Sequence, residues 1–387
     1  MRISLYYFFL IGALGLFLPY MPPYYESLGF SGRQIALIGS LSSVMMIFAP
    51  PLWGFWADRS RRPTVLIRVA TVGAALSFIL MLWARSFSGV LIVMGVVSLF
   101  YTSISSLTDS VALAAARRTG AQWSRWRMWG SVGFVAGGSL LSLWRGEGAS
   151  PAAVLPMTLG FLVLAAFTAF GVPRDPDAAP TLPSAREALA LLREPPLLLF
   201  LGASLLHWAA MAPYHLFLAV HLDRLGADPR WMGVAVGLAV GTEIGIMWAF
   251  QRVATIPARA LFFSTFLLGA ARWLATSFAD TGPSIALLQA LHGLTFGAFF
   301  VAGLLHLEGL LPPQLRATGR ALFTSVVFGV GGVLGNMVSG QLYDTGGAAL
   351  SYQIAAGAEI VALIPLLASF ALLRRRDRPP EALASTP

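Results

Sequence analysis

The sequence predicts an all-α integral membrane protein whose twelve transmembrane helices form two six-helix bundles. Hydrophobic residues make up 57% of the 387 residues and charged residues only 11%, which leaves too little polar surface to cover a water-soluble globule. Twelve apolar segments are each long enough to cross a bilayer. In addition, the second half of the chain repeats features of the first, as expected for a duplicated unit.

The apolar segments predict helices because a backbone in lipid has to satisfy its own hydrogen bonds, and a bilayer core about 30 Å thick needs roughly 20 helical residues. In chain order, the expected spans are residues 4–23, 33–57, 64–84, 88–115, 127–144, 152–171, 197–219, 231–250, 259–278, 284–311, 321–341 and 350–373. The first apolar run is too long for a signal peptide, and no small-residue cleavage site follows it. We therefore interpret it as a retained first span.

The arginines predict the orientation of these spans. All 26 basic residues are arginine; with an even number of spans the two termini share a side, and that side holds twenty arginines against five on the other. The positive-inside rule then places both termini in the cytoplasm of a multi-pass protein of the cell inner (plasma) membrane. Because topology explains the arginines, the net charge of +9 does not indicate nucleic-acid binding.

The longest cytoplasmic connection, residues 173–196, divides the chain into an N-terminal bundle (1–172) and a C-terminal bundle (197–387) with a short basic tail. Its Pro, Asp and Ala content is typical of a linker, with a short surface helix at 184–193. A shift of 194 residues places Ser131, Phe134 and Gly137, in span five, on Ser325, Phe328 and Gly331, in span eleven.

The residue types that are missing exclude several chemistries. The chain has no cysteine and no lysine, which excludes disulfides, thiolate metal sites, a P-loop lysine and a Schiff-base lysine. No paired His, Asp and Glu motif of an intramembrane enzyme is present. We therefore expect no enzyme activity, no cofactor and no metal, and as partners a small-molecule substrate, protons and the lipid bilayer, bound by a monomer.

The charged stretch GFWADRSRRP, residues 54–63, interrupts two apolar spans. Its arginines, Arg59 and Arg62 among them, cannot enter hydrocarbon cheaply and hold the loop on the cytoplasmic side. Asp58 at the end of the span can cap a nearby helix N-terminus or pair with an arginine of a neighbouring span. A role in setting the membrane topology explains the arginines. Acidic residues contribute little to topology, so Asp58 is expected to have a further role.

This stretch resembles the loop signature of the major facilitator superfamily, and the resemblance covers nearly the whole chain. The segments RWRMWGSVGF (125–134) and LHGLTFGAFF (291–300) resemble the phenylpropionate-permease branch, which is related to lactose permease and to nucleoside/proton symporters. The resemblance implies the major facilitator fold. It also implies a gating motif in which Asp58, with Arg59 and Arg62, holds an inter-half contact that closes the cytoplasmic side, and it includes Arg125 and Arg127.

Ionisable side chains within the spans are the candidates for mechanism, because charge in a bilayer is costly and usually functional. Glu243, Arg272 and His292 fall at similar depths, about 9–18 Å from the outer ends of their spans. Glu243 is expected to exchange a proton, His292 to relay or bind one, and Arg272 to clamp a carboxylate. The resemblance adds that relatives of lactose permease use a Glu, an Arg and a His in these same three spans. A purely structural polar cluster is the alternative.

Further candidates come from the other spans. Asp109 is expected either to couple protons or to pair with Arg125 or Arg127. Trp208, His207 and Asn336 are expected at the substrate, with packing as the alternative for Trp208. A partner for Glu359 is not evident from the sequence. Four glycines at four-residue intervals in span eight, from Gly233 to Gly245, predict close packing of another helix.

Together these features predict a secondary active transporter that takes up a small organic solute by alternating access, coupled to protons. An aromatic or other carboxylic acid, a sugar and a nucleoside all remain compatible substrates. A drug/proton antiporter is the alternative within the class, although span five lacks the Gly-Pro signature of such antiporters. A non-transporting membrane sensor or scaffold is the alternative outside it.

Overall fold

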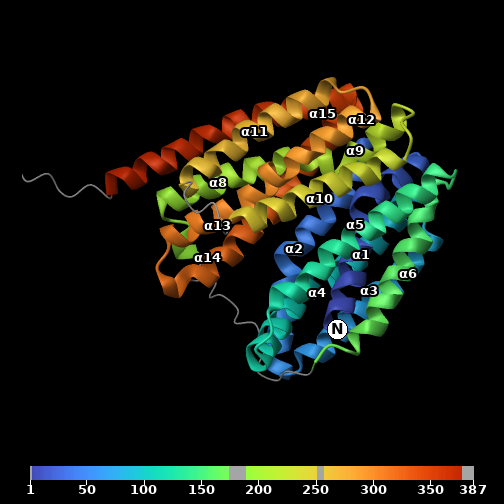
Figure 1. Ribbon diagram of the computed structural model, residues 1–387, viewed down its shortest axis with the longest axis horizontal. Helices are drawn as coiled ribbons and strands as arrows, with labels where there is room; N and C mark the ends of the chain where they lie inside the picture. The colour runs from blue at the N-terminus through green and yellow to red at the C-terminus, as the bar shows by residue number, and fades with distance from the viewer. Residues whose placement is uncertain (1, 174–188, 251–256, 377–387) are drawn as a thin grey trace, which may run out of the picture.

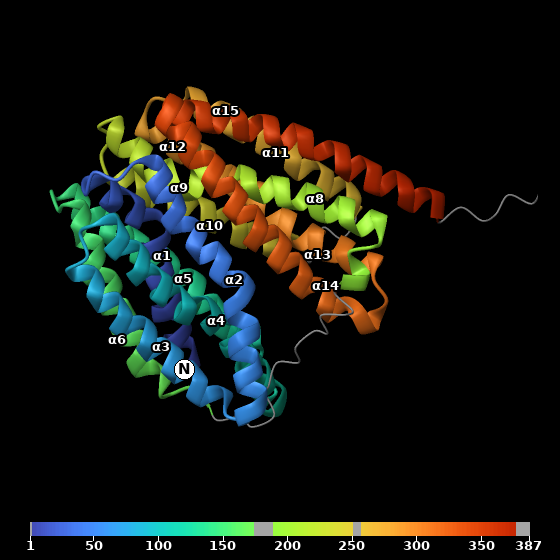
Figure 2. The same ribbon diagram turned by 180° about the vertical axis from the view of Figure 1, so that it is seen from behind.

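Helices make up the regular structure of the computed structural model, which describes residues 2–173, 189–250 and 257–376. The first half contains α1 (Arg2–Ser27), α2 (Gly32–Ser60), α3 (Pro63–Ile79), η1 (Leu80–Leu82), α4 (Phe87–Thr119), α5 (Trp123–Gly146), η2 (Pro151–Ala153) and α6 (Val154–Ala169). The predicted linker and its surface helix lie mostly outside the described residues. The two halves are distinct groups of helices in both views (Figures 1 and 2).

The second half is more broken. It contains α8 (Pro195–Ala210), α9 (Ala212–Arg224), α10 (Arg230–Phe250), α11 (Ala258–Phe278), α12 (Gly282–Leu288), η3 (Gln289–Leu291), η4 (Gly293–Gly297), α13 (Ala298–Leu310), η5 (Pro313–Leu315), α14 (Arg316–Phe323), η6 (Thr324–Val330) and α15 (Gly331–Arg376). Of these, η4 and η6 are π-helices, a form that occurs frequently at functional sites.

All twelve predicted spans are helical. Within the described chain, nine stretches meet the length and composition needed to cross a membrane, and one of them, Thr318–Arg374, contains two spans. That stretch folds back at Gly347, whose φ of 70° is left-handed and suits a glycine. The helices α5 and α10 complete the twelve.

Glycines bring the first and fifth helices of each half close together. A Cβ on Gly137 of α5 would lie 2.7 Å from the carbonyl oxygen of Gly12 in α1. In the second half, a Cβ on Gly331 of α15 would lie 3.0 Å from the carbonyl oxygen of Leu205 in α8. The shared contact is what a duplicated six-helix unit predicts, because only glycine lets two backbones approach so closely.

The predicted glycine ridge of α10 behaves differently. Gly233 does pack closely, since its Cβ would lie 2.6 Å from the Ser142 hydroxyl of α5. The positions of Gly237, Gly241 and Gly245, in contrast, face open space with no neighbouring atom within 4 Å. The packing prediction is therefore wrong for three of the four glycines in this conformation.

The two halves meet at one end, which we call the contact end, and diverge toward the end where residues 173 and 189 flank the linker, which we call the linker end (Figures 1 and 2). At the contact end Arg145 pairs with Asp223 at 2.9 Å, and Arg224 pairs with Glu26 at 2.6 Å. Asp344 also caps the N-terminus of α2 by accepting from the Gly32 amide at 2.6 Å. Polar contacts between the described halves therefore hold the contact end shut.

Candidate functional site

A cavity of about 480 Å³ lies between the two halves. The first half lines it with α1, α2, α3, α4 and α6, and the second half with α8, α9, η4, α13, η6 and α15. Both π-helices therefore contribute to the wall. A volume of about 300–1,000 Å³ is usual for a small-molecule site, so a small organic solute fits this one.

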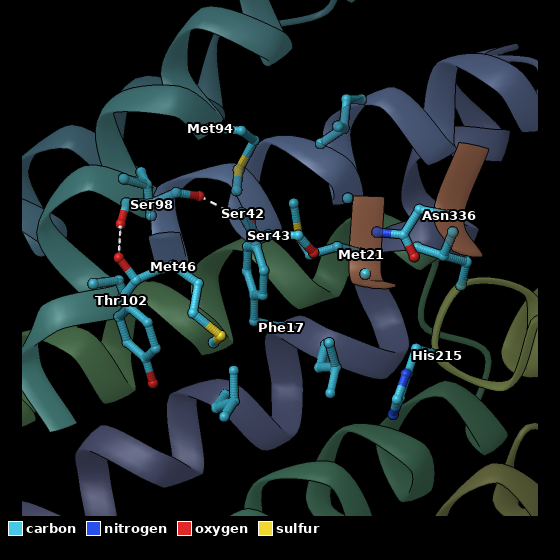
Figure 3. Close-up of a pocket in the computed structure, with 18 of the residues that line it drawn as sticks. Phe17, Met21, Ser42, Ser43, Met46, Met94, Ser98, Thr102, His215 and Asn336 are labelled. Carbon is cyan, nitrogen blue, oxygen red and sulfur yellow. Dashed lines mark hydrogen bonds between the residues drawn. The ribbon is translucent and has the colours of Figure 1, made fainter. Parts of the chain in front are cut away.

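The wall formed by the first half is rich in hydroxyl groups (Figure 3). Ser42 of α2 and Ser98 of α4 form a hydrogen bond of 2.9 Å, and the Thr102 hydroxyl donates to the Ser98 carbonyl oxygen at 2.8 Å. The hydroxyl groups of Tyr25 and Thr158 are buried and have no hydrogen-bond partner among the described residues. Unsatisfied buried hydroxyls are costly, and a ligand would reach either one only after the side chains around it shift.

The wall formed by the second half combines aromatic rings with two polar side chains. Trp208 lies 4.6 Å from the ring of Phe328, 5.9 Å from that of Phe296 and 5.1 Å from that of His215, measured between ring centres. His215 and Asn336 line the cavity as well (Figure 3). The site predictions for Trp208 and Asn336 thus fall on residues of the cavity wall.

None of the described residues that line the cavity carries an Asp, Glu or Arg side chain. A ligand there meets hydroxyl, amide, imidazole and indole groups together with aromatic and aliphatic surface. Such a surface suits a neutral ligand that combines hydrogen-bonding groups with an apolar face.

Arg272 lies behind this wall rather than on it. Its side chain is fully buried and donates to the Thr295 hydroxyl at 2.8 Å and to the Gln289 side-chain oxygen at 2.5 Å. Its guanidinium also lies 4.8 Å from the ring centre of Tyr214 and 4.2 Å from that of Trp273. In this conformation the predicted carboxylate clamp is occupied by protein groups.

His292 contacts Arg272, as their predicted depths suggested. The Arg272 guanidinium donates to His292 Nδ1 at 3.2 Å, and because arginine only donates, that nitrogen carries no proton here. The imidazole also stacks on Tyr214, with ring centres 5.1 Å apart. His292 is therefore neutral in this state.

Glu243 lies apart from this pair. Its side chain is half-buried on α10 and makes no hydrogen bond or ion pair with the described residues. The Cβ position of Gly297 lies 3.2 Å from its Cγ, so a larger residue at 297 would press on the Glu243 side chain. The structure thus brings together two of the three residues predicted to lie at a common depth.

His207 is fully buried and does not line the cavity. Its Nδ1 lies 2.7 Å from Glu359 Oε2, and its Nε2 lies 2.9 Å from the Thr295 carbonyl oxygen. Glu359 is fully buried too, and it accepts from the Trp273 indole at 3.2 Å. The carboxylate that the sequence left without a partner thus pairs with a histidine that was predicted to bind substrate.

Asp109 pairs with Arg127 at 3.8 Å, which is one of the two arginines expected for it. The Tyr7 hydroxyl donates to Asp109 at 2.5 Å, and the Trp123 indole donates to the Tyr7 oxygen at 3.3 Å. Arg125, the other arginine, is exposed. This half-buried cluster joins α1, α4 and α5 within the first half.

The residues of the loop signature lie at the linker end. Asp58 belongs to α2, but its side chain lies outside the described part of the structure. Arg59 and Arg62 are exposed, and Arg61 between them ends α2 in a left-handed conformation with φ of 49°. The gating role of this motif stays a prediction.

Sequence reasoning missed His215 and the role of Glu359. Both are polar residues within otherwise apolar helices, which is the signal that singles out candidates in a membrane span. The partner of Glu359 is His207, which lies 152 residues away in the sequence. The direction in which His215 points depends on the break between α8 and α9 at Met211.

Comparisons with known proteins agree on one family. The model of the MFS_1 like family matches residues 1–354. Maltose permease of Geobacillus stearothermophilus is 28% identical over 377 residues, covering 97% of this chain and 94% of the permease. The probable 3-phenylpropionic acid transporter of Escherichia coli is 24% identical over 353 residues, covering 88% and 90%. A crystal structure of the nucleoside transporter NupG superposes with a TM-score of 0.84 at 18% identity, covering 95% of this chain and 98% of that one, and shows the same fold.

Proposed function

Because the chain belongs to the MFS_1 like family, a branch of the major facilitator superfamily of membrane transporters, we propose that it takes up a neutral, hydroxylated solute of the sugar or nucleoside class, driven by protons. The observation that carries this proposal is the cavity between the halves, whose wall offers hydroxyl, amide and imidazole groups but no described Asp, Glu or Arg side chain.

The polar groups of the wall are arranged on both sides of the solute. Ser42, Ser98 and Thr102 supply hydroxyl groups on the wall of the first half, and Asn336 supplies an amide on the wall of the second half. Hydroxyl groups of a sugar can both donate to and accept from such side chains. Trp208, Phe296 and Phe328 supply ring surface on which the apolar face of a sugar, or a nucleobase, can stack.

A carboxylate substrate is less well served in this conformation. Arg272, the cation predicted to bind one, is buried among Gln289, Thr295 and His292, so a carboxylate would have to displace those hydrogen bonds. The named relatives include transporters of maltose and of nucleosides alongside one of 3-phenylpropionic acid, so the class of substrate has to be decided by the site.

Alternating access follows from the arrangement of the halves. The halves are joined at the contact end through Arg145 with Asp223 and Arg224 with Glu26, and their helices diverge at the linker end. By the positive-inside rule the linker end faces the cytoplasm, so this conformation would be open to the inside. The proposed proton carrier is Glu243, a role supported by its half-buried position and by the absence of a hydrogen bond to it among the described residues.

The test is uptake by the purified protein in proteoliposomes, with an imposed inward proton gradient. We expect accumulation of radiolabelled maltose or uridine in preference to 3-phenylpropionate, and loss of gradient-driven accumulation with retained exchange in Glu243→Gln. Asn336→Ala should raise KM about tenfold, which corresponds to about 1.4 kcal/mol, the loss of a hydrogen bond or two.

The matched control is Glu147→Gln, because Glu147 is an exposed carboxylate outside the cavity. It should transport like the wild type. Preferred uptake of 3-phenylpropionate would reject the neutral substrate, efflux against the proton direction would indicate an antiporter, and no flux with any probe would favour a sensor or scaffold.

A further inference from the structure

Five side chains on four spans form a closed buried ring within the second half. Glu359 of α15 contacts His207 of α8, whose other ring nitrogen contacts the carbonyl of Thr295 in η4. The Thr295 hydroxyl accepts from Arg272 of α11, Arg272 lies against the Trp273 ring, and the Trp273 indole donates to Glu359. From the sequence we considered His207, Arg272 and Glu359 separately, and we singled out neither Thr295 nor Trp273.

The hydrogen-bond geometry fixes how many protons the histidine and the carboxyl group hold. A backbone carbonyl only accepts, so His207 Nε2 carries a proton that it donates to Thr295. Nδ1 and the Glu359 oxygen are 2.7 Å apart, and two bare lone pairs repel at that distance. One further proton therefore lies between them, on either atom.

Arg272 makes this shared proton dispensable. With the proton in place, the pair is neutral overall, and the guanidinium is a buried cation whose described hydrogen-bond partners are all uncharged. When the proton leaves as H⁺ to water, the Nδ1–H or O–H bond breaks and Glu359 becomes a carboxylate that is connected to Arg272 through Trp273. In the protonated state the hydrogen bond between His207 and Glu359 stabilises the ring. In the deprotonated state the opposite charges of Glu359 and Arg272 stabilise it instead.

The titratable groups packed around the pair do not supply another charge. His292 is neutral because it accepts from Arg272, and Tyr214 of α9 and Tyr352 of α15 face Arg272 and Trp273 with their rings. The imidazole of His207 also packs against the rings of Phe266 and Phe299.

The ring is one residue away from the cavity on two elements. Trp208 follows His207 on α8, and Phe296 follows Thr295 on η4, and both line the cavity. A backbone shift at His207 or Thr295 would therefore also displace Trp208 or Phe296, the aromatic residues on which a solute would stack.

We propose that His207 and Glu359 form a proton-binding site, with Arg272 as its counter-charge, that exchanges its proton during transport. This proposal rests on the proposed function, which places a proton-driven solute in the adjacent cavity. It adds a second proton site to Glu243 and assigns Arg272 to that site rather than to the substrate.

The direct test counts protons without any substrate. Purified wild type and Glu359→Gln are titrated in lightly buffered detergent from about pH 6 to about pH 10, a range in which an exposed glutamate is already ionised. We expect the wild type to release one more proton per molecule than Glu359→Gln, whereas Glu147→Gln matches the wild type. Glutamine keeps the shape and can donate to Nδ1, so the variant should fold.

A second variant guards against a folding defect. His207→Gln retains an amide that can reach the Thr295 carbonyl but removes the imidazole that shares the proton, so the Glu359 proton should be released over a different pH range than in the wild type. Both variants should still exchange labelled maltose or uridine across the membrane at equal pH while losing accumulation driven by a proton gradient.

The outcomes separate this proposal from the one on which it rests. Superimposable titration curves of the wild type and Glu359→Gln, with wild-type accumulation still driven by protons, would overturn the proton site alone. Full gradient-driven accumulation by Glu359→Gln would overturn its role in transport. A wild type that is indifferent to the gradient would overturn the proposed coupling, whatever the titration shows.

Discussion

Gly269→Ala should destabilise the protein although alanine is the better helix former. Gly269 lies on α11, and a Cβ there would lie 2.6 Å from Glu359 Oε1 and 2.8 Å from its Cδ. The carboxyl group is the end of a flexible side chain, but hydrogen bonds to His207 and Trp273 tether it in place. The added methyl group can therefore be accommodated only by stretching or breaking one of them.

The size of the effect follows from two opposing terms. Replacing glycine by alanine within a helix gains about 1 kcal/mol. Losing one hydrogen bond of a buried carboxyl group costs about 1.5–3 kcal/mol. The net expectation for Gly269→Ala is destabilisation by about 0.5–2 kcal/mol, as the difference between these two terms.

Gly357→Ala is the matched control. Gly357 lies within α15, in the same half, and no atom lies within 4 Å of its Cβ position, so alanine should stabilise the protein by about 1 kcal/mol. Thermal unfolding in detergent, with both variants measured beside the wild type, gives the comparison. In a Glu359→Ala background the penalty of Gly269→Ala should disappear, since the two positions are coupled. If Gly269→Ala unfolds at the same temperature as Gly357→Ala, the placement of the Glu359 carboxyl group is refuted.

Three further predictions concern the two halves. Arg145→Gln removes the ion pair with Asp223, in which the Arg145 side chain is nearly buried, at the contact end. The conformational equilibrium should shift toward the state with an open contact end by about 1–2 kcal/mol, roughly tenfold. Cysteines introduced at the contact end should then be labelled faster, and unchanged labelling would mean that the pair does not hold that end. Gly241→Leu adds a side chain where no atom lies within 4 Å, so the thermal stability of this conformation should be preserved. The leucine should block closure of the linker end and abolish transport. Normal transport would show that no helix packs against α10 at Gly241 during the cycle. Gly133→Ala places a Cβ 2.0 Å from the Phe8 carbonyl oxygen, a backbone atom that cannot move aside, so it should unfold several degrees below Gly160→Ala, whose Cβ position is open.

The class of the protein could be predicted because composition and hydrophobic length decide it. A chain of this hydropathy has to cross a membrane, and each apolar window has to be helical, whatever its neighbours are. For the same reason all twelve spans were found, while their ends were placed less well. The first helix ends at Ser27, four residues past the predicted end at 23, and includes Pro22 and Pro23.

The residues of the site could be predicted only in part. Polar residues in apolar spans were the right signal for Trp208 and Asn336, which line the cavity, and for the contact of Arg272 with His292. Depth along a helix says nothing about the direction in which a side chain points around it. Glu243 was therefore grouped with two residues that it does not touch, and the four glycines of α10 were given a neighbour that only Gly233 has.

The sequence by itself determined that this chain is a helical membrane protein of twelve spans, because burial of apolar length in lipid is a property of each segment alone. The pairing of His207 with Glu359, the burial of Arg272 behind the cavity wall and the uncharged lining of the cavity were decided by the tertiary structure. These features depend on how each helix is rotated and on where α8 and α15 break or bend, which is set by packing between residues far apart in the chain.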